Sequence, residues 1–193
     1  MAKLSTAKTD LIDAAVELFR QRGYAGVGVA DLLAAANAPR GSLYFHFPGG
    51  KEEIGVEAVR RFGDEATGRF RSLTESGVDM IEFIDRTFRY VAREAKTHRY
   101  EISCPLLAVA SDVGADTPEL GLAVRYVLAS WEQEVARAAE QRGYTHDAAI
   151  ELGSALVSAM EGATLTSKAH GTSTPFIYAG NAVKALAAQL APR

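Results

Sequence analysis

Histidine and cysteine, which many enzymes and metal sites rely on, are sparse in this chain of 193 residues. Its four histidines, His46, His98, His146 and His170, are scattered, and no nucleophile motif or phosphate-binding loop occurs. Cys104 is the single cysteine, which excludes an internal disulfide and a zinc site built on several thiolates. We therefore predict a protein that is not an enzyme, with no catalytic residue, no metal and no cofactor.

Polar side chains of another kind are concentrated in one short run. Arg40, Ser42, Tyr44 and His46 fall close together, and Lys51 follows. Guanidinium, hydroxyl, phenol, imidazole and ammonium groups can all donate hydrogen bonds to anionic oxygens. What this run can bind depends on the elements that hold it in place.

Three short helices are predicted in the first fifty residues, over residues 6–22, 29–36 and 39–45. Gly23 ends the first, Asn37 tolerates the left-handed conformation that a reversal needs, and Pro39 fits a first helical turn. Proline and paired glycines at 48–50 end the third helix. This layout is that of a helix-turn-helix, although a small helical bundle has helices of the same size.

The remainder of the chain predicts longer helices and no strand. Turn residues separate them, and no stretch shows the two-residue alternation of a strand. We expect an all-α fold of about nine helices, with a helix-turn-helix domain at 1–50 and a larger domain at 51–193. The longer helices are predicted over residues 51–74, 78–98, 103–113, 118–142, 146–169 and 174–191.

Charge is distributed unevenly between these two parts. The net charge is -3, but residues 1–51 hold six Lys/Arg against four Asp/Glu, whereas the remainder is acidic. A mildly basic end suits contact with phosphate. The first ten residues lack an apolar signal segment, and charges interrupt every apolar run before the ~18 residues of a membrane span. We expect a soluble, cytoplasmic protein with no membrane partner.

One stretch of sequence resembles a known family. The run GSLYFHF (residues 41–47), followed by PGGK (residues 48–51), is similar to the recognition-helix signature of the tetracycline-repressor (TetR) family. The resemblance extends back through AAVELF (residues 14–19) and covers about the first 60 residues. The variants PRGS (39–42) and FPGGK (47–51), with Cys104-Pro105-Leu106 and Trp131, resemble the lincomycin- and multidrug-resistance branch.

The resemblance implies a DNA-binding role for the third helix. Tyr44 and His46 would bind phosphate oxygens, while Arg40 and Ser42 at the helix start would read base edges. Gly41 would allow close approach of the backbone. We expect the inward side chains that hold this helix to be Leu43, Phe45 and Phe47. The DNA-binding residues implied are Gly28, Pro39, Arg40, Gly41, Ser42, Tyr44, His46 and Lys51.

Two departures from the family pattern stand out. Val27 and Gly28 replace the usual Ser or Thr at the start of the second helix, so a side-chain cap and a phosphate contact are missing. Residues 37–39 replace a Gly-Val-Ser turn. A helical small-molecule-binding or protein-interaction module that has lost DNA binding is therefore an alternative function.

The resemblance also implies a homodimer on a palindromic double-stranded operator, formed through the last two helices. Small residues there permit close helix approach, either between two chains or within one. These positions are Gly153, Ala155, Ala159, Gly162, Ala163, Ala182, Ala185 and Ala187, with Leu152, Leu156 and Leu186.

In such proteins the larger part also binds a small-molecule inducer. Glu161 interrupts an apolar run, so it either pairs with a basic side chain or faces a ligand. Cys104, at a predicted helix start, is either a reactive thiol or an inert one. The ligand-binding candidates are Phe83, Phe88, Leu107, Tyr126, Trp131, Met160 and Glu161, and most large apolar groups of this kind fill a core.

The helix predicted at 51–74 would link the inducer to the recognition helix. Gly55, Gly63 and Gly68 lie in it, and glycine within a helix costs about 1 kcal/mol relative to alanine. We interpret them as sites of tight packing or as a pivot. The hypothesis is that ligand binding swings this helix and changes the spacing of the two recognition helices.

Overall fold

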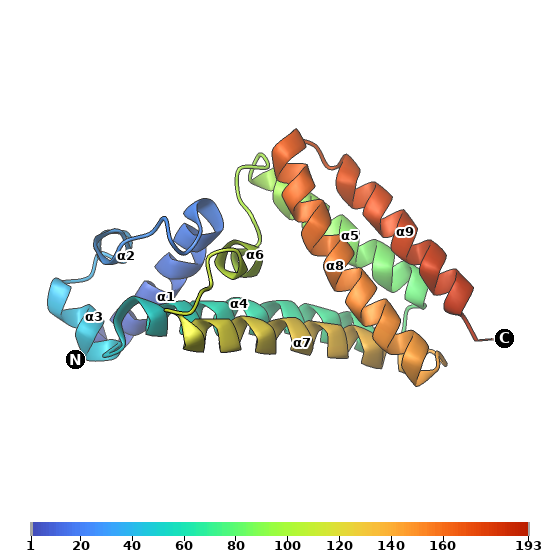
Figure 1. The fold of residues 1–193 in the computed structure, drawn as a ribbon, viewed down its shortest axis with the longest axis horizontal. Coiled ribbons are helices and arrows are strands. Elements are labelled where there is room, and N and C mark those ends of the chain that lie inside the picture. The colour runs from blue at the N-terminus through green and yellow to red at the C-terminus, as the bar shows by residue number, and fades with distance from the viewer. Residues whose placement is uncertain (1, 193) are drawn as a thin grey trace. The chain divides into compact units, whose positions relative to one another are not determined.

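The computed structural model describes residues 2–192, and over these residues the chain forms nine α-helices and no strand (Figure 1). This confirms the all-α prediction, and most helix ends lie within two residues of those predicted. The helices are α1 (Ala2–Arg22), α2 (Val29–Ala35), α3 (Arg40–His46), α4 (Gly50–Glu75), α5 (Met80–Thr97), α6 (Pro105–Ala110), α7 (Pro118–Glu140), α8 (His146–His170) and α9 (Thr174–Leu190).

Helix α6 differs most from its prediction, because it is shorter at both ends. Pro105 disfavours the helical conformation at the residue before it, and Cys104 is accordingly extended, with φ -62° and ψ 127°. Cys104 is half-buried and forms the N-cap. At the other end the helix closes at Ser111, whose hydroxyl donates to the Leu107 carbonyl. A segment predicted at 103–113 is thus a helix of six residues.

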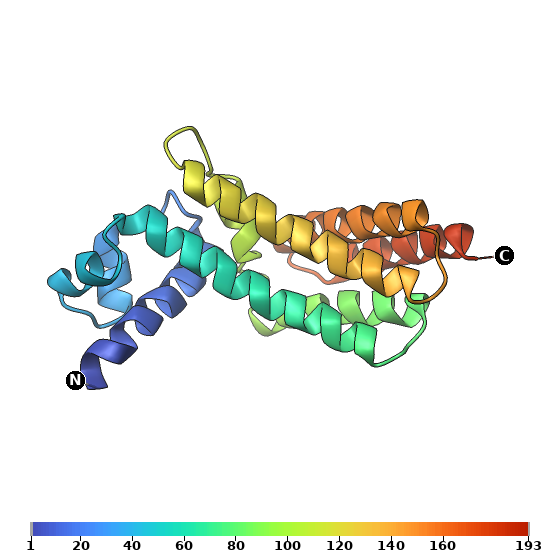
Figure 2. The same ribbon diagram turned by 90° about the horizontal axis from the view of Figure 1, so that it is seen from below.

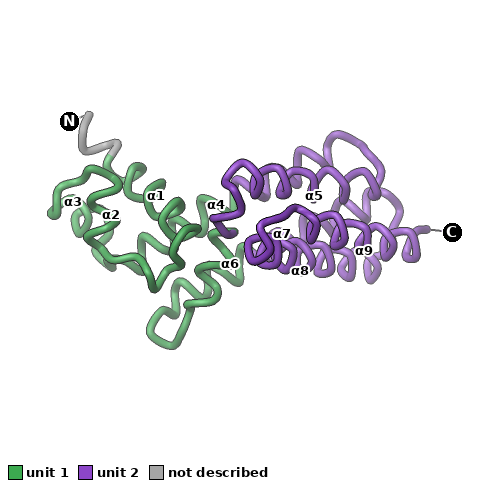
Figure 3. The backbone as a smooth tube through the Cα atoms, turned by 90° about the horizontal axis from the view of Figure 1, so that it is seen from above, with its two compact units in different colours: residues 1–64, 104–127 green, residues 65–103, 128–193 purple. Residues whose placement is uncertain are grey.

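The chain folds into two compact units (Figure 3). Unit 1 comprises Met1–Asp64 and Cys104–Val127, and unit 2 comprises Glu65–Ser103 and Leu128–Arg193. The predicted domain division after residue 50 marks the end of the helix-turn-helix motif. The unit that contains the motif continues along α4 and includes α6 and the first part of α7.

In unit 1, α2 and α3 pack on α1 through a small apolar core (Figure 2). Asn37 has φ 49°, so the predicted left-handed reversal between α2 and α3 is confirmed. Gly23, at φ 74°, ends α1 as predicted. The core side chains are Leu11, Ala15, Phe19, Val27, Leu32, Leu33, Leu43 and Phe47.

In unit 2, α5, α8 and α9 pack against one another. The ring of Phe83 stacks on Phe70 with centroids 6.3 Å apart, and the Trp131 ring meets Phe70 edge-on at the same distance. Arg142 Nη1 donates to the Ala138 carbonyl at 2.7 Å, and its guanidinium also reaches carbonyls at 73, 74 and 78. This side chain therefore satisfies carbonyl groups near the ends of α4 and α7.

The glycine at position 153 lets α7 and α8 approach closely. A Cβ there would lie nearer the Glu132 carbonyl oxygen than real Cβ atoms come to any atom. Replacing Gly153 with alanine must therefore push two backbones apart, and we expect it to lower the free energy of unfolding by about 1–3 kcal/mol in urea titrations.

Gly68→Ala is the matched control, because Gly68 is also a helix-interior glycine but a Cβ there meets no described atom within 4 Å. This variant should gain stability, by up to about 1 kcal/mol, from helix propensity alone. Equal stability of the two variants would contradict the close packing of α7 on α8.

Candidate nucleic-acid interface

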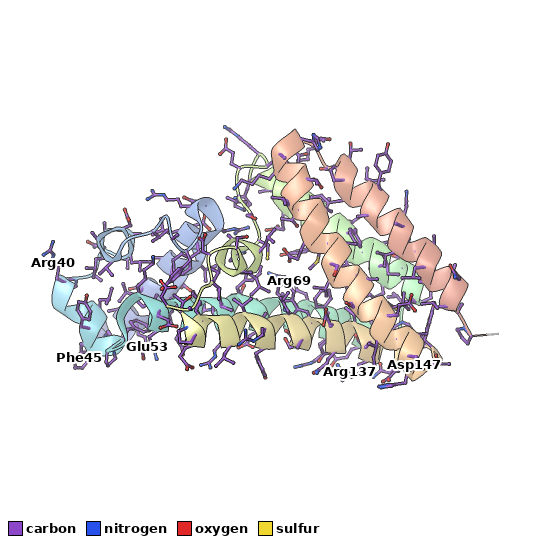
Figure 4. The ribbon with its side chains drawn as sticks, viewed as in Figure 1. Arg40, Phe45, Glu53, Arg69, Arg137 and Asp147 are labelled. Atoms are coloured by element: carbon purple, nitrogen blue, oxygen red, sulfur yellow. The ribbon has the colours of Figure 1, made fainter. Side chains whose placement is uncertain are left out.

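Helix α3 presents one face to solvent and one to the core of unit 1. Arg40, Gly41, Tyr44 and Phe45 are exposed, with 61% of Tyr44 and 72% of Phe45 accessible. Figure 4 labels Arg40 and Phe45 on this helix. A guanidinium, a phenol and an apolar ring are thus available together on one short helix. These groups suit the edges of bases and the phosphates beside them.

The prediction for Phe45 was wrong. It was expected to hold α3 against its neighbours with Leu43 and Phe47, and only those two are buried. Successive helical residues are about 100° apart, so positions 43 and 47 share the inward face and position 45 lies on the opposite side. The helical spacing could have identified Phe45 as an outward-facing residue.

Ser42 and His46 lie one helical turn apart and are directed inward. Ser42 is only 7% exposed, and its Oγ has no hydrogen-bond partner among the described residues. His46 is half-buried, and its ring packs edge-on against Phe45 at 4.9 Å. The predicted base contact from Ser42 does not fit this orientation. In this structure Arg40 and Tyr44 carry the outward-facing donors of α3.

Lys51 is held at the start of α4 by an aromatic ring. Its Nζ lies 4.0 Å from the centroid of Tyr24, a cation–π distance. Burial lowers the pKa of Lys51, and the nearby Asp112 carboxylate opposes that shift. The turn before it is closed by Glu53 Oε2, which accepts the Gly49 N–H at 2.8 Å. The ammonium group therefore has a defined position next to α3.

The family departure at Val27 and Gly28 has a structural explanation. Val27 is 1% exposed and belongs to the core of unit 1. Gly28 is the N-cap of α2, and its N–H is accepted by Asp31 Oδ2 at 2.8 Å. Gly28 and Pro39 are both exposed at helix starts, so their backbones are accessible.

The ligand-binding candidates are divided between the two units. Phe83, Phe88, Trp131 and Met160 are buried in unit 2, and Glu161 is half-buried there. Leu107 is half-buried in unit 1. Tyr126, also in unit 1, is 70% exposed, so its predicted place in a pocket lining does not fit.

Helices α8 and α9 both carry exposed apolar side chains. On α8, Ile150 and Leu165 are more than half exposed, and a Cβ at Gly162 would meet no described atom within 4 Å. Ile177 and Tyr178 are exposed on α9. We call these five residues the α8–α9 stripe. A contiguous patch of exposed apolar groups is typical of an interface, and these residues lie on the two helices predicted to form one.

Part of the small-residue pattern has a different use. Gly153, Ala163 and Ala187 are buried within the single chain, together with Leu152 and Leu156. Packing within one chain was one of the two alternatives for these positions, and for these five the structure shows it. Gly162, Ala182 and Ala185 are exposed.

Among residues 2–192, none of the helices is apolar over a length that would cross a bilayer.

Comparison with known proteins gives two family matches that together span most of the chain. Residues 11–58 match "Bacterial regulatory proteins, tetR family", and residues 81–182 match "Transcriptional regulator LmrA/YxaF-like, C-terminal domain". Among curated relatives, YxaF of Bacillus subtilis, an HTH-type transcriptional regulator, is 26% identical, covering 96% of this chain and 97% of YxaF. LmrA of the same organism is 25% identical, covering 92% and 94%.

Solved structures share the fold. A TetR-family regulator from Agrobacterium tumefaciens superposes with a TM-score of 0.82 at 19% identity, over 98% of this chain and 100% of that one. A second, from Chloroflexus aurantiacus, gives 0.80 at 24% identity, over 98% of each chain.

Proposed function

Because this chain belongs to the TetR family of transcriptional regulators, in its LmrA/YxaF-like branch, we propose that it is a repressor of this kind. It binds a palindromic operator as a homodimer, and a small-molecule inducer releases it. The observation that carries the proposal is the outward face of α3, with Arg40 and Tyr44 exposed on it.

Arg40 reads sequence in this proposal and the other groups position it. A guanidinium can donate two hydrogen bonds to the O6 and N7 of guanine, and this pair of contacts distinguishes guanine from the other bases. A contact with phosphate carries no such information, because every nucleotide has the same phosphate. Tyr44 and Lys51 bind phosphates on either side. The exposed backbones at Gly28, Pro39 and Gly41 approach the DNA closely, and His46 contacts phosphate after its ring turns outward. Phe45 adds an apolar surface suited to a thymine methyl group.

The α8–α9 stripe supports the homodimer. One α3 helix covers only a few base pairs, so a two-fold pair of such helices is needed for a site one helical turn long. Two copies of the stripe related by a two-fold axis would cover each other's apolar side chains. The space above Gly162 allows a partner helix to come close.

Inducer binding is proposed for unit 2, around Phe83, Phe88, Trp131 and Met160, with Glu161 at its edge. A ligand releases the operator only if it binds the released state more tightly than the bound state. Helix α4 belongs to unit 1 up to Asp64 and to unit 2 from Glu65, so in this proposal it transmits the effect of the inducer from one unit to the other. Gly55 and Gly63 serve close packing in unit 1, since their Cβ atoms would press on Tyr24 and Val127. Gly68 has no such contact and is the position at which α4 can pivot.

Gel-shift titration against the DNA upstream of the chain's own gene tests this function. We expect a dimer to bind, and the affinity to fall linearly with salt on a logarithmic plot. If two protomers make about six phosphate contacts, affinity should drop about 10³-fold between about 50 and about 200 mM salt. Absence of binding under low salt would instead favour a module that has lost DNA binding.

A further inference from the structure

A carboxylate distant in sequence is bound to the turn between α1 and α2. Asp112 Oδ2 accepts the Ala25 backbone N–H at 2.8 Å, across 87 positions of the chain. Asp112 lies just after α6, in the segment of unit 1 that the chain adds between the two parts of unit 2. This hydrogen bond thus joins the helix-turn-helix to a segment outside it.

The turn between α1 and α2 packs closely against this carboxylate. Gly23 has φ 74°, and a Cβ there would lie 2.7 Å from Asp112 Oδ2. A Cβ at Gly26 would collide with the Arg22 carbonyl. Two glycines therefore let the turn fold tightly on the end of α1 and let the carboxylate reach the Ala25 N–H. The chain enters α2 only a few residues later.

A second carboxylate ties the same segment to α4. Glu52 Oε1 accepts the N–H groups of Glu119 and Leu120 at 3.0 and 3.2 Å, in the first turn of α7. The neighbouring Lys51 lies over Tyr24, within the turn that Asp112 binds. Asp112 and Glu52 therefore connect residues 104–127 to the α1–α2 turn and to the start of α4.

We propose that Asp112 is a positioning residue for DNA binding: its hydrogen bond to the Ala25 N–H fixes the α1–α2 turn and so the direction in which α2 and α3 leave α1. The proposal rests on the DNA-binding function proposed above. In this proposal Asp112 itself makes no contact with DNA. Its loss should lower operator affinity without altering the number of phosphate contacts.

Three variants separate this role from general stability. Asp112→Ala removes the acceptor, and Asp112→Asn keeps an acceptor oxygen without the charge. Ser111→Ala is a control one residue away, because the Ser111 hydroxyl donates to the Leu107 carbonyl of its own helix. We expect Asp112→Ala to lose about threefold in affinity per protomer, and so about tenfold for the dimer. Asp112→Asn should recover most of it, and Ser111→Ala should match the parent protein.

Amide hydrogen exchange followed by NMR gives a readout that needs no DNA. In Asp112→Ala the Ala25 amide should exchange faster, while the amides of buried Leu152 in unit 2 and of its neighbours should not change. The slope of affinity against salt should stay that of the parent. Parent affinity in Asp112→Ala, or a loss in Asp112→Asn as large as in Asp112→Ala, would overturn the proposal.

Tyr44→Ala, measured in the same titration, distinguishes the two ways of failing. If Tyr44→Ala weakens binding and Asp112→Ala does not, the positioning role alone is wrong. If neither weakens binding, the DNA interface on α3 is wrong, and a parent-like exchange rate at Ala25 in Asp112→Ala would then overturn the hydrogen bond as well.

Discussion

Replacing Gly162 with arginine should convert the protein to a monomer and lower its operator affinity by about 10²–10⁴-fold, the gain that linking two binding sites usually gives. Gly162 lies on the exposed side of α8, in the same stripe as Ile150 and Leu165. Two arginines brought together across a two-fold axis would be desolvated without a counter-charge, which costs several kcal/mol. The monomer would keep only one α3 helix for the operator.

Sedimentation equilibrium measures the oligomeric state and fluorescence anisotropy the affinity. Gly68→Arg is the matched control, because Gly68 is an exposed glycine inside α4 whose Cβ also meets no described atom within 4 Å. It should remain dimeric. Circular dichroism should show parent helix content in both variants. A dimeric Gly162→Arg variant with parent affinity would place the interface elsewhere.

Two substitutions on α3 should have effects of different kinds. Arg40→Ala should lower affinity for the best operator by about 10–100-fold for each guanine that it no longer binds, since a bidentate pair gives about 1–3 kcal/mol of discrimination. Affinity for operators changed at that base should hardly fall. Tyr44→Phe should lower affinity several-fold on every sequence alike, because a phosphate hydrogen bond carries no sequence information.

Anisotropy titrations against a set of operators, each changed at one base pair, separate the two patterns. Arg60→Ala is the control: Arg60 is an exposed arginine of α4 in unit 1, paired with Glu57 at 3.6 Å, and should leave affinity and preference unchanged. Identical base preferences in Arg40→Ala and the parent would exclude Arg40 as the reading residue.

The sequence contains most of the information on local structure. Glycine at 23 and asparagine at 37 tolerate the left-handed conformation that ends a helix, and proline at 39 fixes φ before a helix. The ends of α1, α2 and α3 could therefore be predicted to within a few residues. Leu43, Phe45 and Phe47 were all expected to face inward, and Leu43 and Phe47 do, four residues apart. The same spacing excludes Phe45 from that face, and the error came from treating all large apolar residues as core.

Contacts between distant segments could not be predicted. The Asp112–Ala25 hydrogen bond depends on α6 packing against α1, and nothing near Asp112 in the sequence marks its partner. The orientation of Ser42 is similar, because a small hydroxyl is tolerated on either face of a helix. The small residues of α8 posed a third problem: Gly153 and Gly162 have the same sequence signature, and only packing shows that one is buried and the other exposed.

Methylation interference on the bound operator is the most direct test that the outer face of α3 enters the major groove. Methylation of guanine N7, which lies in the major groove, should block binding at guanines in two half-sites about 10 base pairs apart, and in Arg40→Ala this interference should vanish. Interference confined to adenine N3 in the minor groove, or a pattern that Arg40→Ala leaves unchanged, would contradict it.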